Sequence, residues 1–88
     1  MSEGTLANGF TFKVNDDAYD NWELLEILQQ IDDGKEVLIV KAFPLLVGAE
    51  QFNALKEHIR KQDGKVSVSK MVLCFTEIME QIKNGKKS

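Results

Sequence analysis

The feature that most constrains the fold is an apolar segment in the middle of the chain. Nine of the eleven residues from Val37 to Val47 are apolar, so this segment has no polar face to turn to water. Its length and the helical patterns on either side favour a buried helix, broken or kinked at Phe43-Pro44 because proline lacks a backbone N–H. A buried strand over residues 36–43 remains an open alternative. The rest of the chain has to fold around this segment.

Three other segments show the periodicity of amphipathic helices. Apolar side chains recur every three or four residues from about Asp17 to Asp33, from Ala49 to Gln62, and from a Ser67 cap to about Lys83. The acidic run at residues 15–17 is the predicted N-cap of the first helix. Gly34, Gly48 and Asn84-Gly85 follow the ends of helical patterns, as helix-stop residues do. The pattern predicts a mainly α fold, a small bundle of about four helices.

The N-terminal part is predicted to be extended. Residues 10–14 alternate apolar and polar, which is typical of a short strand or of an arm lying on the helices. With no partner strand recognised in this chain, a strand donated to a neighbour is also possible. Residues 1–9 are small and polar, and we expect a flexible N-terminus there. A single domain then spans residues 10–83, followed by a flexible basic tail at 84–88.

The turn before the last helix has the centre of a calcium-binding loop without its ligands. Asp63-Gly64 matches positions 5 and 6 of the twelve-residue loop. Positions 1, 3 and 12 would then be Ile59, Lys61 and Lys70, none of which offers a side-chain oxygen. We therefore expect a tight helix–turn–helix that binds no calcium.

Candidate residues for other chemistry are few. His58 has no second His or Cys one helical turn away, which excludes a zinc site within one chain on ligand count. Cys74 has no nearby histidine to lower its pKa and is expected to be a small buried side chain. We expect no enzyme, no catalytic residues, no cofactor and no metal. A basic group near the turn (Lys56, Arg60, Lys61, Lys65, Lys70) is diluted by acids, so nucleic acid is not an expected partner.

Charge is unevenly distributed along the chain. Residues 1–34 carry eight acidic side chains against one lysine, a net −7, and residues 35–88 carry ten basic against six acidic, a net +4; together they give the net charge of −3. Such asymmetry can orient a partner or favour head-to-tail self-association, although solvated helix faces also explain it. No apolar run is long enough to span a bilayer, and one cysteine suits a reducing compartment. We expect a cytoplasmic protein that does not bind membranes.

The apolar segment is also the best candidate for a binding surface. Three amphipathic helices can cover a fourth only partly in a chain of 88 residues. An uncovered remainder would bind a protein partner or a second copy. The candidate partner-binding residues are Phe10, Phe12, Trp22, Val37, Val40, Phe43 and Leu46. That all of them lie in the core is the equally weighted alternative.

Three short motifs resemble a known family. An acidic ELLE helix (Glu23–Glu26), a Leu-Leu-x-Gly-x-Glu-Gln step (Leu45–Gln51) and a DG-x-V-S turn (Asp63–Ser67) occur in the same order in the small tail assembly chaperones of tailed phages and prophages of Gram-positive bacteria. The resemblance covers about residues 10–83, with Ala49 where an acid is more usual. It implies a non-catalytic protein that binds the tape-measure protein during tail-tube assembly in the host cytoplasm. A small helical adaptor or regulatory protein-binding module is the alternative.

Overall fold

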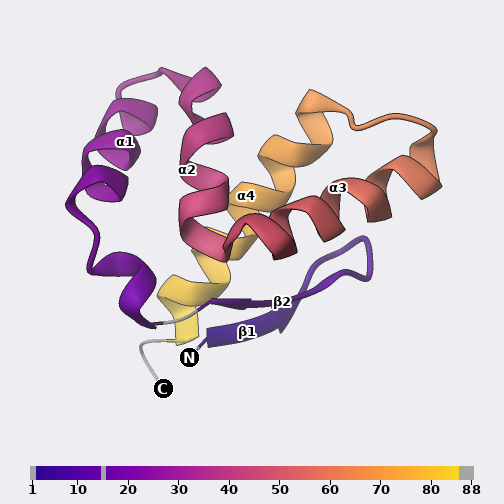
Figure 1. The fold of residues 1–88 in the computed structure, drawn as a ribbon, viewed down its shortest axis with the longest axis horizontal. Coiled ribbons are helices and arrows are strands. Elements are labelled where there is room, and N and C mark those ends of the chain that lie inside the picture. Colours follow the sequence, from indigo (N-terminus) through magenta and orange to yellow (C-terminus); the bar gives the residue numbers. More distant parts are fainter. Residues whose placement is uncertain (1, 15, 86–88) are drawn as a thin grey trace.

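The chain folds into four α-helices with a two-stranded β-hairpin packed beneath them (Figure 1). The computed structural model describes residues 2–14 and 16–85. The elements run in the order β1 (Ser2–Thr5), β2 (Thr11–Val14), a 3-10 turn η1 (Asp16–Tyr19), α1 (Trp22–Asp32), a 3-10 turn η2 (Glu36–Leu38), α2 (Ile39–Val47), α3 (Ala49–Asp63) and α4 (Val68–Gly85). The predicted fold class, a small and mainly helical bundle with a short N-terminal strand, is confirmed.

The N-terminal residues form a strand, so the prediction of a flexible segment over residues 1–9 is wrong for residues 2–9. β1 pairs antiparallel with β2, with Ser2 opposite Val14 and Thr5 opposite Thr11. The expectation that the strand at residues 10–14 lacks a partner in this chain is therefore also wrong. β2 itself alternates as predicted, with Phe12 and Val14 buried and Thr11 and Lys13 exposed. The small, polar side chains of residues 1–9 do not indicate a strand, because two strands pair through backbone groups and this pairing needs no apolar side chains.

The first helix begins later than predicted. Residues 16–19 form a 3-10 turn, and α1 starts at Trp22 with Asn21 as its N-cap. The Asn21 side-chain oxygen accepts a hydrogen bond from the backbone N–H of Leu24 at 3.2 Å, which satisfies a free donor of the first turn. Of the predicted cap residues, Asn15 lies outside the described residues. This late start places Trp22 at the first position of the helix, where it is 74% exposed.

The central apolar segment is helical, and the strand alternative is not adopted. η2 and α2 run without a break from Glu36 to Val47, and Pro44 lies within α2, so the predicted break at Phe43-Pro44 is wrong. In a regular helix the backbone N–H of residue 44 would donate to the carbonyl of Val40, and proline has no such N–H. Val40 lies on the exposed side of α2, so a water molecule can donate to its carbonyl instead. Only one face of α2 is buried, through Ile39, Ala42, Phe43 and Leu46.

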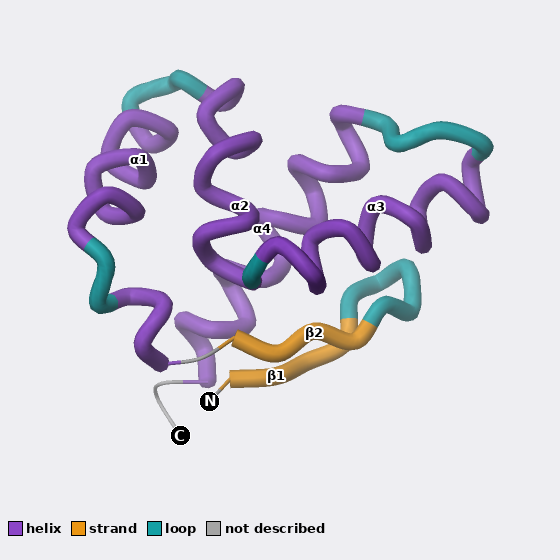
Figure 2. The backbone as a smooth tube through the Cα atoms, viewed as in Figure 1, coloured by secondary structure: helices purple, strands orange, loops and turns teal. Residues whose placement is uncertain are grey.

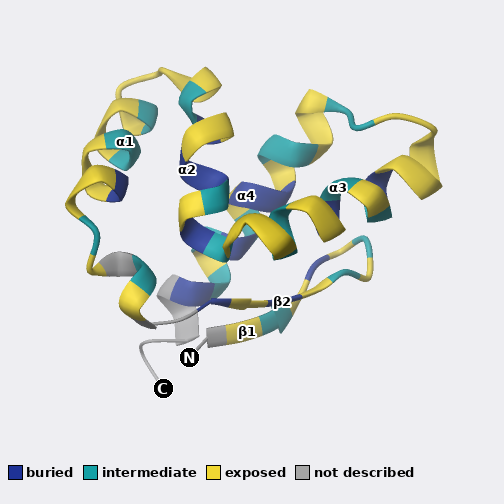
Figure 3. Ribbon diagram, viewed as in Figure 1, coloured by how far each residue is buried: buried dark blue, intermediate teal, exposed yellow. Residues whose placement is uncertain are grey.

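The last two helices agree with the sequence expectations. α3 covers the predicted range within one residue, and Ser67 caps α4 by accepting from the Lys70 N–H at 3.5 Å. The α4 ladder packs inward through Phe75, Ile78 and Ile82, which join residues of every other helix in one core (Figure 3). α4 runs through Asn84 and Gly85, which the prediction assigned to a tail over residues 84–88, and residues 86–88 lie outside the described part.

Two further observations bear on where the molecule can act. The path of the backbone brings the hairpin alongside α3 and the C-terminal half of α4, while α1 lies on the other side of α2 (Figure 2).

Within the described ranges, no single helix is long and apolar enough to cross a membrane; residues 36–47 and 49–63 reach that length and composition only as a pair bent by 120°.

Candidate partner-binding groove

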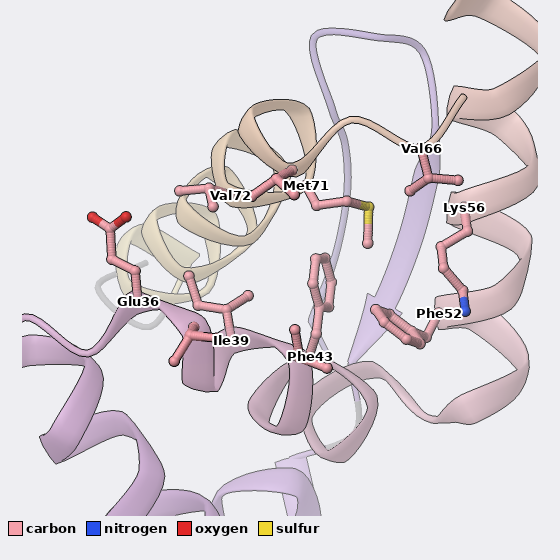
Figure 4. A pocket seen from close by; sticks show the side chains of 11 residues that line it. Glu36, Ile39, Phe43, Phe52, Lys56, Val66, Met71 and Val72 are labelled. Atoms are coloured by element: carbon pink, nitrogen blue, oxygen red, sulfur yellow. The ribbon is translucent and has the colours of Figure 1, made fainter. Parts of the chain in front are cut away.

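An apolar groove of about 550 Å³ lies between α2, α3 and the beginning of α4 (Figure 4). It exists because α2 buries one face against the core and leaves the neighbouring apolar face uncovered. The α3–α4 connection closes one end with Val66. The groove is lined by Glu36, Val37, Ile39, Val40, Phe43, Phe52, Lys56, Val66, Val68, Met71 and Val72.

The floor of the groove belongs to an aromatic cluster of the core. Phe43 is fully buried, and its ring centroid lies 5.2 Å from those of both Phe52 and Phe75. The contact with Phe75 is edge-on, the geometry that aromatic pairs favour. These three rings come from α2, α3 and α4, so the floor is held by three helices at once.

The rim of the groove exposes aliphatic side chains to water. Val37, Val40 and Val68 are 77%, 68% and 81% exposed. Each would gain roughly 25 cal/mol for every Å² of apolar surface that a partner covers. Apolar side chains gathered around a concave floor, rather than scattered singly, are the usual mark of a binding site.

Two charged side chains mark opposite edges of the groove. Glu36 stands at the start of η2, and Lys56 lies across from it on α3 (Figure 4). The Lys56 ammonium sits 4.6 Å from the centroid of the Phe52 ring, a cation–π contact that fixes its position. The groove therefore offers an apolar floor with one fixed positive charge at its α3 edge. Such a surface can bind an apolar helix face that carries an acidic side chain.

The structure divides the seven predicted partner-binding residues. Val37 and Val40 line the groove, and Trp22 is exposed on α1, apart from it. Phe12, Phe43 and Leu46 are buried in the core, so the prediction that they form partner surface is corrected; only Phe43 contributes, as groove floor. Phe10 is half-buried, with its ring centroid 5.6 Å from that of His58. Sequence reasoning missed Val66 and Val68, although two valines around the polar cap Ser67 were a signal.

His58 and Cys74 both contact Asn8 at the tip of the hairpin. His58 Nε2 lies 2.9 Å from the Asn8 carbonyl oxygen, and the Asn8 side-chain amide donates to Cys74 Sγ at 3.6 Å. Burial, reinforced by the Glu77 carboxylate, raises the pKa of the Cys74 thiol, against the opposing effects of Asn8 and Lys70. A nucleophilic cysteine needs a lowered pKa. This cluster therefore fits an anchor for the hairpin better than a catalytic site.

Potential metal ligands are dispersed. Within the described parts of the chain, no three His, Cys, Asp or Glu side chains gather closely enough to hold a metal ion. At the calcium-like turn, Ile59 to Asp63 belong to α3, and Ile59 is buried in the core. Only residues 64–67 are non-helical there, a connection far shorter than a twelve-residue calcium loop.

Comparison of the chain with protein-family models, with curated proteins and with solved structures finds no match. The function must therefore be argued from the groove and from the motifs of the sequence.

Proposed function

We propose that this protein is a non-catalytic tail assembly chaperone of a tailed phage or prophage, which binds a helical segment of the tape-measure protein in the groove between α2, α3 and α4. The observation that carries the proposal is the exposure of Val37, Val40 and Val68 around an aromatic floor. A domain this small gains little by leaving three valines in water unless another protein covers them.

The shape of the groove favours a helix as the bound segment. It lies between helices and is apolar along its floor, which suits an amphipathic helix that inserts side chains spaced three, four and seven residues apart. The resemblance implies that the bound protein is the long tape-measure protein. Covering its apolar helix faces in turn is a task for a small protein with one such groove.

The family motifs support the proposal through the framework that they build. Leu24, in the ELLE stretch, and Leu46, in the Leu-Leu-x-Gly-x-Glu-Gln step, are core residues. Gly48 forms the corner between α2 and α3, and Ser67 caps α4 beside the groove. These motif residues hold the groove-forming helices in place, and the groove side chains themselves lie mostly outside the motifs.

The alternative is a small helical adaptor or regulatory module that binds another protein. The same groove would serve it, because the exposed valines do not specify the sequence of a bound helix. Gene order separates the two functions: a tail assembly chaperone is expected between the gene for the tail tube and a very long gene for the tape-measure protein.

Binding to peptides of the neighbouring tape-measure protein tests the proposal. Overlapping peptides that cover its helical regions should include some that bind this protein, as measured by calorimetry. The measurements use the Trp22→Ser variant, so that the exposed Trp22 of α1 cannot compete with the peptide for the groove. Val40→Glu and Val68→Glu should weaken that binding at least about tenfold, which corresponds to 1.4 kcal/mol. Leu73→Ser is the matched control, because Leu73 is exposed on α4 but does not line the groove. Binding that Val40→Glu and Val68→Glu leave unchanged would contradict the proposal.

A further inference from the structure

The outer face of α1 is a second exposed apolar surface, separate from the groove. Trp22 and Leu25 are 74% and 46% exposed and lie one helical turn apart. Glu23, Glu26 and Asp32 on the same helix are exposed too. The described part of the chain contains two ion pairs, Arg60–Glu57 and Lys70–Asp63, and neither includes a residue of α1. The helix thus presents an aromatic side chain beside acidic residues that have no ion-pair partner among the residues that the structure describes.

The groove carries the complementary charge. Lys56 lies at its α3 edge, and Lys65 is an exposed neighbour in sequence of the lining residue Val66. Residues 1–34, which include α1, have a net charge of −7, and the remainder of the chain has +4. The acidic part of the sequence therefore contributes the apolar surface of α1, and the basic part contributes the groove, with Lys56 at one edge.

α1 lies on one side of α2, and α3 and α4 lie on the other (Figure 1). The groove is lined by residues of α2, α3 and α4. α1 packs against α2 and η2, so within one molecule it is held away from the groove by the core it helps to form. A second molecule has no such restriction. Its α1 can approach the groove with Trp22 leading and with its carboxylates near Lys56 at the α3 edge.

We propose that the groove of one molecule receives α1 of a second copy of this chain, with Trp22 and Leu25 as the inserted side chains. The two surfaces are different, so each molecule keeps a free groove at one end and a free α1 at the other. Contacts of this head-to-tail kind build rings or open filaments, whereas a self-complementary patch stops at a dimer. A bound client helix would displace α1 of the neighbouring copy, and chaperone self-association would then fall as client binds.

The contact is small, so the association is weak. One tryptophan and one leucine bury an area at the low end of transient interfaces, which suggests a dissociation constant between about 1 µM and 1 mM. Charge contributes to it, so the association weakens as salt rises from about 0.05 M to 0.5 M and the Debye length shortens. Glu36, the acidic residue of the lining, lies across the groove from Lys56 and directs the acidic helix toward the α3 edge.

The single tryptophan makes the contact directly measurable. Emission from Trp22 should shift to shorter wavelength as protein concentration rises, in step with the sedimentation coefficient, because insertion removes the indole from water. Trp22→Ser and Val40→Glu should each give folded monomers, since both side chains are mostly exposed in one molecule. Leu73→Ser, with a side chain 62% exposed outside the groove, should associate like the unchanged protein.

Mixing the two variants is the decisive test. Trp22→Ser keeps an intact groove and Val40→Glu keeps an intact α1, so together they should form a dimer that grows no further. Neither variant alone should do so. A monomer with unshifted emission up to about 1 mM, association that survives Trp22→Ser, or a mixture that stays monomeric would each overturn the proposal. This experiment needs no tape-measure protein, so its failure would leave the proposed function standing.

Discussion

The ammonium of Lys70 lies 3.3 Å from the carboxylate of Asp63, so the residue at the last position of the calcium-like loop pairs with the carboxylate at its centre. In a working loop both positions would supply oxygen to the metal. Here they join the C-terminus of α3 to the first turn of α4 across a short connection. The tight turn of the motif is present, and the Lys70–Asp63 ion pair occupies the two positions that would supply metal ligands in a calcium-binding loop.

Calcium is therefore predicted to have no effect. Millimolar calcium should leave the melting temperature and the far-ultraviolet spectrum unchanged, because a bound ligand raises stability only when it binds the folded state. Lys70→Glu restores the last carboxylate, yet it should still confer no calcium response, since Ile59 and Lys61 remain helical. That variant should change stability by less than about 1 kcal/mol, as partly exposed ion pairs contribute little. A rise of several degrees with calcium in either protein would contradict this account.

Two neighbouring positions of α2 should respond in opposite ways to substitution. Val40→Glu places a charge at a rim position that is 68% exposed, so the protein should stay folded while groove binding is lost. Phe43→Ala removes a fully buried ring from the groove floor and should destabilise the fold by about 3–5 kcal/mol. Urea denaturation followed by circular dichroism measures both. Unfolding by Val40→Glu would place that residue in the core and remove the case for a groove.

The helices could be predicted from the sequence because their periodicity is local. Their apolar spacing marks Leu24, Phe75 and Ile78 as inward-facing, and all three are buried. The same spacing also marks Trp22 and Leu25, which are exposed.

The groove could be predicted only in part. Val37 and Val40 belong to the apolar segment, but the rotation of α2 about its own axis decides that Phe43 is buried and Val40 is exposed. That rotation depends on packing against α3 and α4.

The hairpin could not be predicted because distant polar contacts hold it. Asn8 reaches His58, Gln62 and Cys74, which lie at least fifty residues away in the sequence. The Gln51 side chain pairs with both the N–H and the carbonyl of Lys13, at 2.6 and 2.7 Å, as a neighbouring strand would. No pattern in residues 1–9 indicates these distant partners of Asn8.

Gln51 should therefore contribute to stability in a way that its neighbours on α3 do not. Its amide bonds the Lys13 backbone twice and also donates to the Val47 carbonyl at 2.9 Å. Gln51→Ala should cost about 1–2 kcal/mol and speed hydrogen exchange at the Lys13 amide. The exposed Asn53 on the same helix is the control: Asn53→Ala should leave exchange at Lys13 unchanged and should not lower stability, because alanine is the better helix former. Equal effects from the two substitutions would show that the Gln51 contacts carry no net stability.

Two glycines should differ in how well they tolerate asparagine. Gly48, between α2 and α3, has φ 87° and ψ 149°, a region that side chains rarely enter, whereas Gly64 after α3 has φ 80° and ψ −10°. Space is not the cause at either site, because an added Cβ would meet nothing within 4 Å. Gly48→Asn should cost about 1–3 kcal/mol. Gly64→Asn should cost less than about 1 kcal/mol, because asparagine accepts the left-handed conformation. Equal losses in thermal unfolding would contradict this distinction.

The buried thiol of Cys74 should make the fold sensitive to alkaline pH. Burial, with a smaller contribution from the Glu77 carboxylate, raises its pKa above the ordinary value of 9.0, so the folded state holds the thiol proton more tightly than the unfolded chain does. This adds stability that is complete below pH 9.0 and is lost as the pH rises through the folded-state pKa. The stability difference between the unchanged protein and Cys74→Ala, measured by urea denaturation, should shrink between about pH 7 and pH 10. Subtracting the variant removes the contributions that are common to both proteins. A difference that stays constant across this range would mean that the thiol ionises equally well in the folded and unfolded chains.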